Sequence, residues 1–358
     1  MCNTLKDKLD ATCTTNSRII DNTDFIAEFK EGRWIVKWKW KSPPHDVPKK
    51  GYCSAREKDR KAFDEEIQGW INEGILIRYD QELHGELKVF LPVFGVRQEK
   101  GDTVKVRPVF DFRKFNEHVE SHPGDGLPVC SDRLRQWRQI GPNITIVDLR
   151  KAYLQVHVDE SLWTYQAITW HGEVYLLTRM GFGLTSAPKI MTSIVETVLS
   201  FDSSVKEAVS SYIDDLMVDT SKISIDQVVK HLTRWGLSTK SPEPIGVGQS
   251  VRVLGLRVDT NFCWSRDGLL PNSPGENTDI LTRRKVHKII GELMGHFPIL
   301  SWLRVHCAFI QRCSSDDKVD WDEPVSSETA EYLREILNRI EKEGDPARGR
   351  WIVSPVAP

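Results

Sequence analysis

Residues 209–218 read VSSYIDDLMV, and this stretch decides the fold because it places two adjacent acids inside an apolar frame. The apolar residues on either side are typical of two short strands, with Asp214 and Asp215 at the turn between them. Burying two carboxylates without compensation is costly, so the pair favours a bound divalent cation. The alternative is that the two acids only form a polar hairpin turn.

A third acid, Asp148, ends the apolar and β-branched run ITIV at residues 144–147. If that strand lies beside the acidic turn, three carboxylates converge on one sheet edge. Such a set can hold two Mg²⁺ ions about 3.5–4 Å apart. The alternative is that Asp148 only caps the N-terminus of a helix that follows it.

The composition excludes several classes of protein. The chain has 358 residues, and its 49 basic and 51 acidic residues give a formal charge of −2, too neutral to indicate nucleic-acid binding by itself. The length predicts two or three domains. Seven cysteines without a C-x-x-C pair argue against a disulfide scaffold, a zinc ribbon and a zinc knuckle. We find no apolar run of 18 residues, so secretion and membrane spanning are not expected.

Apolar periodicity predicts the other elements. Residues 1–53 are expected to be an irregular leader with one aromatic strand at 34–40. A helix is predicted from Ser54 to a stop at Gly74, and further helices over residues 186–199 and 225–235. Strands are predicted over 89–98 and 104–112, joined by a tight turn at 100–102, and over 251–258.

The region after about residue 265 is expected to be helical and polarised in charge. Residues 281–312 hold six Lys or Arg and one Glu, a local charge of +5. Residues 316–343 hold ten acids and four bases, a local charge of −6. The near-neutral total is therefore an average over unlike segments.

Six segments occur in the order VKVRPVFDFRKFN, IVDLRKAYLQV, MGFGLTSAPKIM, SYIDDLMV, WGLSTKSPEPI and VLGLRV. The ordered set resembles the reverse transcriptases of LTR retrotransposons and retroviruses over about residues 55–260. The resemblance implies an α+β fold shaped as a right hand, in which the palm is built on an antiparallel sheet. It implies fingers and the start of the palm over 54–143, the palm over 144–262, and a helical thumb or connection over 263–358.

The implied activity is RNA-directed DNA polymerisation, in which a primer 3′-hydroxyl attacks a dNTP. Asp148, Asp214 and Asp215 fall on the family's metal-binding carboxylates, and the backbone carbonyl of Leu149 on a further ligand. The cofactor implied is a pair of Mg²⁺ ions, with Mn²⁺ as a substitute. Lys240 falls on a lysine that acts as general acid toward pyrophosphate.

The resemblance also implies a set of nucleotide-binding residues. Lys100 and Arg107 fall on hairpin cations that grip the triphosphate, although Lys100 by itself would be a solvated turn charge. Tyr153 matches the aromatic gate that excludes a ribose 2′-hydroxyl, and its alternative is a core tyrosine. Phe182 matches a position that contacts nucleotide and template and is phenylalanine in gypsy-type elements. Backbone amides near the triphosphate are expected at Arg150, Lys151 and Ala152.

The carboxy-terminal region, from LTRRKVHKII onward, resembles the thumb and connection of BEL/Pao-type elements. The implied contacts to the phosphates of a primer-template duplex come from Arg283, Arg284, Lys285 and Lys288. The alternative is a solvated helical face without a partner. Histidines and cysteines of this region lack the spacing of a structural zinc site.

The partners implied are an RNA and DNA primer-template, dNTPs, and the ribonuclease H and integrase parts of a polyprotein. The location implied is intracellular, either cytoplasmic in a virus-like particle or nuclear. One alternative is a domesticated or truncated module that binds nucleic acid without polymerising it, and another is a non-catalytic partner subunit. A viral RNA polymerase is less favoured, because Tyr153 and the Y-x-D-D form both indicate DNA synthesis.

Overall fold

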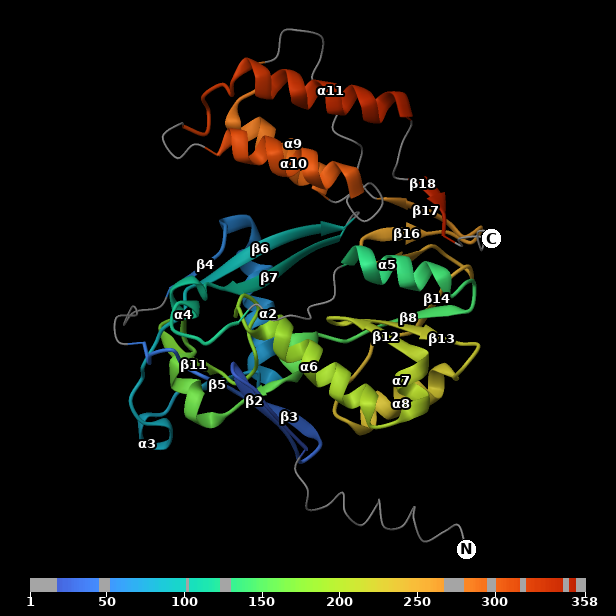
Figure 1. Cartoon of the computed structure of the whole chain (residues 1–358). Helices are drawn as coiled ribbons and strands as arrows, with labels where there is room; N and C mark the ends of the chain where they lie inside the picture. Colours follow the sequence, from blue (N-terminus) through green and yellow to red (C-terminus); the bar gives the residue numbers. More distant parts are fainter. Residues whose placement is uncertain are drawn as a thin grey trace, which may run out of the picture. The chain divides into compact units, whose positions relative to one another are not determined.

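The computed structural model describes residues 18–44, 52–100, 103–122, 130–266, 280–294, 301–315, 320–343 and 348–351. The chain forms two compact units. Unit 1 comprises Met1–Leu127, Asp148–Leu216 and Ile223–Ser241, and unit 2 comprises Pro128–Val147, Met217–Lys222 and Pro242–Pro358. Both units contain helices and strands (Figure 1). The mixture of helices with several separate sheets confirms the coarse prediction of a mixed α and β fold.

Unit 1 begins with an antiparallel meander of β1 (Arg18–Asp21), β2 (Phe25–Lys30) and β3 (Arg33–Trp38), and β9 (His157–Val158) joins β3 in parallel. The turn between β2 and β3 has positive φ at both Glu31 and Gly32, as tight hairpins require. Along β3 the odd positions are exposed or half-buried, and the even positions are buried tryptophan and valine. The prediction that residues 18–38 are irregular apart from one strand is therefore wrong.

The helix predicted before Gly74 is confirmed as α2 (Arg60–Asn72), which follows a short 3-10 turn, η2 (Glu57–Asp59). Phe63, Ile67 and Trp70 are its buried residues, at helical spacing. Next come β5 (Leu76–Arg78) and the short helix α3 (Gln81–His84). β5 pairs with β11 (Glu173–Leu177), which pairs with β10 (Ala167–Trp170).

A long hairpin follows in unit 1, and its strands run side by side in Figure 1. It consists of β6 (Val93–Lys100) and β7 (Thr103–Phe110), and β4 (Cys53–Ser54) lies parallel to β6. The register runs from Val93 opposite Phe110 to Lys100 opposite Thr103. Both predicted strands are confirmed, whereas the turn residues 101–102 lie outside the described residues.

The acidic stretch forms β12 (Val209–Tyr212) and β13 (Asp215–Asp219), and the run that ends in Asp148 forms β8 (Ile144–Asp148). The sheet order is β12-β13-β8-β14, where β14 is Glu243–Pro244. These strands confirm the predicted secondary structure around the acids. The other elements here are α4 (Arg113–Asn116), η3 (Ala152–Gln155), η4 (Glu160–Tyr165), α6 (Ala187–Ser200), α7 (Ser203–Ala208) and α8 (Ile225–Arg234).

Helices α6 and α8 confirm two further predictions. Helix α6 buries Ile190, Ile194 and Val198 on one face. Helix α8 begins at a capping box, in which the Ser224 side chain accepts from the Gln227 N–H and the Gln227 side chain accepts from the Ser224 N–H.

Unit 2 contains α5 (Cys130–Gln139) and a sheet of order β15-β16-β17-β18. The strands are β15 (Val251–Val253), β16 (Leu256–Val258), β17 (Cys263–Arg266) and β18 (Arg348–Arg350). The single strand predicted over residues 251–258 is wrong, because Leu254 and Gly255 both have positive φ and turn the chain. A glycine inside a strand pattern signals such a break.

The remaining part of unit 2 is helical, as predicted: α9 (Arg283–Met294), α10 (Ser301–Ser314) and α11 (Ser327–Glu343). These helices share a core that includes Val286, Leu293, Leu303, Ile310 and Leu333. Within the described residues, no helix combines the length and the apolar character that crossing a membrane requires.

Candidate active site

The acidic turn lies directly against the end of β8. Ile213 has φ +57° between β12 and β13, which is a strained value for a β-branched residue. Asp214 follows it, and its carbonyl oxygen accepts a hydrogen bond of 3.1 Å from the Leu149 N–H. This bond holds the residue after Asp148 beside the acidic turn. Two of the predicted acids are thereby brought together, and the third begins β13.

Burial and mutual repulsion dominate the electrostatics of these acids. Burial raises the pKa of Asp214, and the neighbouring Asp148 carboxylate raises it further. Burial, followed by the Asp214 and Asp148 charges, raises the pKa of Asp215 to about 7. Lys240 opposes both shifts. The three carboxylates therefore lie close enough to feel one another's charge, and Lys240 offsets only part of their mutual repulsion.

Only one of the two carboxylate oxygens of Asp148 has a hydrogen-bond partner. Its Oδ2 accepts from the ammonium group of Lys240, whereas its Oδ1 is buried and has no hydrogen-bond partner. An orphaned buried carboxylate oxygen beside two further acids has the donor chemistry that Mg²⁺ prefers. In the described part of the chain no three His, Cys, Asp or Glu side chains gather tightly enough to hold an ion by themselves. An ion here would also need backbone, water or substrate oxygens, as Mg²⁺ commonly does.

Backbone pairing with residues 238–240 fixes the position of Asp148. The Lys240 N–H donates to the Asp148 carbonyl at 2.8 Å, and the Arg150 N–H donates to the Ser238 carbonyl at 2.9 Å. Gln155 joins the same two segments: its Oε1 accepts from the Ser238 N–H at 2.6 Å, and its Nε2 donates to the Ser238 carbonyl at 3.0 Å. Gln155 was not among the predicted site residues, because nothing in its local pattern sets it apart.

A cavity of about 550 Å³ opens beside the acids within unit 1. The structure brings nine of the predicted residues to its wall: Arg107, Asp148, Leu149, Arg150, Lys151, Ala152, Phe182, Asp214 and Lys240. Asp215 and Tyr153 do not line it. The backbone of Lys100 lies at the end of β6, and its side chain falls outside the described residues.

The hairpin contributes a second cation that was not predicted. Lys105 and Arg107 both line the cavity, and they are two residues apart on β7. Residues at i and i+2 of a strand point to the same face, so the alternation in VKVRP could have revealed Lys105. Cations on the hairpin therefore share a cavity with the acids of the turn.

Tyr153 stands next to the cavity wall and not in it. Its ring packs edge-on against Phe182, with 5.2 Å between ring centroids. Burial, with a smaller contribution from the Asp214 charge, raises the pKa of Tyr153 to about 12. The phenol therefore stays neutral, and the ring pair forms a rigid apolar edge beside the acids.

The four predicted phosphate contacts in unit 2 lie along α9 in different environments. Arg283 is 8% exposed, and its guanidinium lies 4.5 Å from the centroid of the Trp321 ring. Arg284 forms hydrogen bonds of 2.8 and 3.1 Å with Asp322. Lys285 and Lys288 are exposed: the Lys285 ammonium group donates to the Ile280 carbonyl at 3.3 Å, and that of Lys288 lies 4.0 Å from Glu292. Their role toward nucleic acid stays a prediction.

Two parts of the chain match known protein families. Residues 98–242 match the family described as "Reverse transcriptase (RNA-dependent DNA polymerase)", and residues 282–342 match a "Domain of unknown function (DUF7047)". A protein of Caenorhabditis elegans, "Uncharacterized protein K02A2.6", is 30% identical over 129 residues, which are 35% of this chain. The chain spans about a tenth of the length of that relative, since the match covers 10% of it.

The first match confirms the resemblance to reverse transcriptases over residues 98–242. Asp148, Asp214, Asp215 and Lys240 all fall inside the matched range. The narrower assignments to gypsy-type and BEL/Pao-type elements stay predictions.

Proposed function

We propose that this chain is an RNA-directed DNA polymerase that transfers nucleotides from dNTPs to a primer 3′-hydroxyl. The observation that carries the proposal is the cavity that Asp148 and Asp214 line together with Lys105 and Arg107, inside the range that matches reverse transcriptases. The acids of this lining suit divalent cations, and the cations of the hairpin suit a triphosphate.

Asp148, Asp214 and Asp215 would hold the metal ions, together with the backbone carbonyl of Leu149. The unpartnered Oδ1 of Asp148 and the raised pKa values of Asp214 and Asp215 support this role, because each carboxylate gains from a nearby cation. When bound, two Mg²⁺ or Mn²⁺ ions supply the charge that activates the 3′-hydroxyl and stabilises the leaving pyrophosphate.

The chain's own groups bind and orient the nucleotide. Lys105 and Arg107, with Lys100 at the hairpin end, would hold the triphosphate, and the backbone amides of residues 150–152 would add hydrogen bonds. The Tyr153 and Phe182 ring pair would exclude a 2′-hydroxyl by its bulk. Lys240, which pairs with Asp148, would deliver a proton to pyrophosphate.

The finer architecture belongs to the same proposal. Residues 54–143 would be the fingers and start of the palm, 144–262 the palm, and 263–358 the thumb or connection. An RNA and DNA primer-template would be the substrate, and ribonuclease H and integrase segments of a retrotransposon polyprotein the partners. The enzyme would work in an intracellular virus-like particle or in the nucleus.

Primer extension on a homopolymer RNA template tests the proposal, with Mg²⁺ and Mn²⁺ compared. We expect wild-type protein to extend the primer with dNTPs, and Asp214→Asn to lose about a thousandfold or more in rate, as removal of a metal-binding charge in the transition state should. Asp226→Asn is the matched control, because Asp226 is an exposed acid at the start of α8. An Asp214→Asn protein with the wild-type rate contradicts the proposal.

The same assay separates the non-catalytic alternative. A protein that binds the primer-template in a filter assay and leaves the primer unextended with either metal is a binding module or partner subunit. Stimulation by a longer copy of the chain then identifies the subunit.

A further inference from the structure

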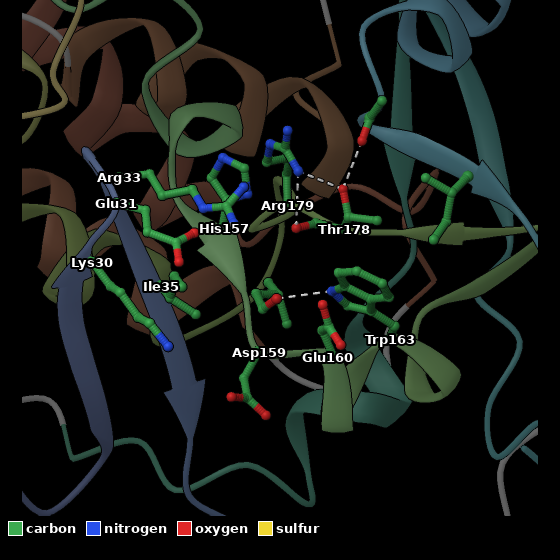
Figure 2. A pocket seen from close by; sticks show the side chains of 13 residues that line it. Lys30, Glu31, Arg33, Ile35, His157, Asp159, Glu160, Trp163, Thr178 and Arg179 are labelled. Carbon is green, nitrogen blue, oxygen red and sulfur yellow. Dashed lines mark hydrogen bonds and ion pairs between the residues drawn. The ribbon is translucent and has the colours of Figure 1, made fainter. Parts of the chain in front are cut away.

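A second cavity of unit 1, about 610 Å³ in volume, has a basic end formed by Arg33, His157 and Arg179 (Figure 2). Strand pairing places these three residues on one face. Ile35 lies beside His157 in the parallel register of β3 and β9, and His157 lies opposite Arg179 in an antiparallel bridge. Arg33 is two residues from Ile35 along β3, so its side chain points to the same face. Figure 2 shows the three side chains gathered together.

Of the two arginines at this end of the cavity, only Arg33 has a carboxylate partner in the described part of the chain, Glu31 at 3.3 Å. Within the described residues Arg179 forms no ion pair, and its Nη1 donates to the carbonyl and hydroxyl oxygens of Thr178. Burial, with the neighbouring Arg33 charge, lowers the pKa of Arg179 to about 10. Burial, with the charges of Arg179 and Arg33, lowers the pKa of His157 to about 4. Burial and the nearness of the two guanidinium groups therefore disfavour positive charge here, and a bound anion would relieve that cost.

The carboxylates of the same cavity do not neutralise Arg179. Glu31 accepts a hydrogen bond of 3.3 Å from Arg33, and both side chains are well exposed. Asp159 caps η4 through the Ser161 N–H and lies 3.8 Å from Lys37. Figure 2 shows Asp159 pointing away from the basic end. Lys30 adds a further cation to the wall.

A smaller cavity of about 260 Å³ lies next to the basic one. This smaller cavity shares His157 and Arg179 with the basic one. It shares Arg150 and Lys151 with the cavity beside the acids. Cationic side chains thus line each of these three cavities of unit 1.

We propose that Arg33 and Arg179, with His157 between them, bind a phosphate-bearing anion. Two guanidinium groups on one face provide forked donors that match phosphate oxygens, and a phosphate supplies the missing negative charge. The anion would be free phosphate or pyrophosphate, or a phosphodiester of a nucleic-acid strand that crosses this face. Anion binding at this site does not require polymerase activity, so it can be tested independently of the proposed function.

His157 provides the readout. In full-length protein with a chelator present, we would follow the histidine ring resonances by NMR, assigning His157 with a His157→Gln variant. Pyrophosphate and a short single-stranded oligonucleotide are added separately, with sodium chloride at equal ionic strength as the control. Bound phosphate should saturably shift the His157 resonance and raise the pKa of His157 from about 4 toward its ordinary value of 6.5.

Variants identify the groups responsible. Arg33→Gln and Arg179→Gln should each weaken binding about tenfold, as loss of a charge-assisted hydrogen bond does. Arg78→Gln is the matched control, since it removes one exposed arginine that pairs with Glu173 elsewhere on the unit. Arg33 is 47% exposed in its side chain, so its variant folds even if Arg179→Gln does not.

The outcomes are distinct. Saturation by pyrophosphate alone assigns a free anion, and saturation by the oligonucleotide alone assigns a strand phosphodiester. The proposal is overturned if neither ligand moves the His157 resonance, or if Arg78→Gln weakens binding as much as Arg33→Gln.

Discussion

The buried carboxylate of Asp24 and the half-buried carboxylates of Asp214 and Asp215, all in unit 1, have opposite surroundings. Asp24 is fully buried, and its two oxygens accept from Lys189 at 2.6 Å and from the His122 ring and N–H at 2.6 and 3.1 Å. Although burial alone would raise the pKa of Asp24, these bonds hold it well below its usual range. Burial raises the pKa values of Asp214 and Asp215, and no comparable set of donors offsets it.

This difference in hydrogen bonding distinguishes an acid that stabilises the fold from acids that are suited to bind a ligand. Asp24, which directly precedes β2, joins α6 and the segment at His122 through bonds within the chain. The acids near the turn leave an oxygen of Asp148 without a partner. A buried charge with complete hydrogen bonding is structural, whereas incomplete bonding in a cavity favours function.

Replacing Asp24 should have the largest effect on stability. Asp24→Ala leaves the Lys189 charge without its partner in a largely buried site, and we expect a loss of about 3 kcal/mol or more in unfolding free energy. Asp21→Ala is the control, because Asp21 is an exposed partner of Lys39 and should cost under about 1 kcal/mol. Urea unfolding measures both. Equal losses would show that Asp24 is not a structural acid.

Replacing Tyr153 tests the proposed function of the cavity beside the acids without changing an acid. Tyr153→Ala removes the ring that packs on Phe182, so we expect about a hundredfold greater use of rNTPs relative to dNTPs in single-nucleotide insertion. Tyr153→Phe keeps the ring and should retain the sugar preference. Unchanged selectivity in the alanine variant would refute the gate.

Gln155 should have a smaller effect, because it acts by positioning. Gln155→Leu removes the hydrogen bonds that tie it to Ser238, and with them part of the support for Asp148. We expect kcat to fall about tenfold with a smaller change in KM for dNTP, since a misplaced acid weakens transition-state contacts. Gln68→Leu, at an exposed position of α2, serves as the control. A KM change alone would indicate a different role.

The last prediction is a pair of opposite pH slopes in stability. Because the folded-state pKa of Asp24 is depressed, its stabilisation is complete above the unfolded value near 4 and is lost as the pH falls below it. Because the pKa of Asp215 is raised to about 7, its contribution makes the metal-free protein less stable as the pH rises from about 4 to 7. Unfolding of Asp24→Asn and Asp215→Asn proteins in a chelator should each lack one slope. A slope that persists in its variant belongs to another group.

Local patterns predicted much of this protein. The helices α2, α6 and α8 follow from apolar spacing, β8 follows from a β-branched run, and β12 and β13 follow from the apolar residues on either side of the acids. The same patterns did not predict elements that contain many charged residues. Strands β1 and β2 show weak alternation, so their sheet was not predicted, and Gly255 split a strand that looked continuous.

What the sequence by itself determined is the identity of the acids and their place at the ends of strands, because strand and turn preferences act over a few residues. The tertiary structure decided which distant groups meet. Gln155 reaches Ser238, Lys105 joins the cavity of Asp148, and Arg33 lies on the face of His157 and Arg179. Such contacts depend on strand register and chain crossing, which no local pattern encodes.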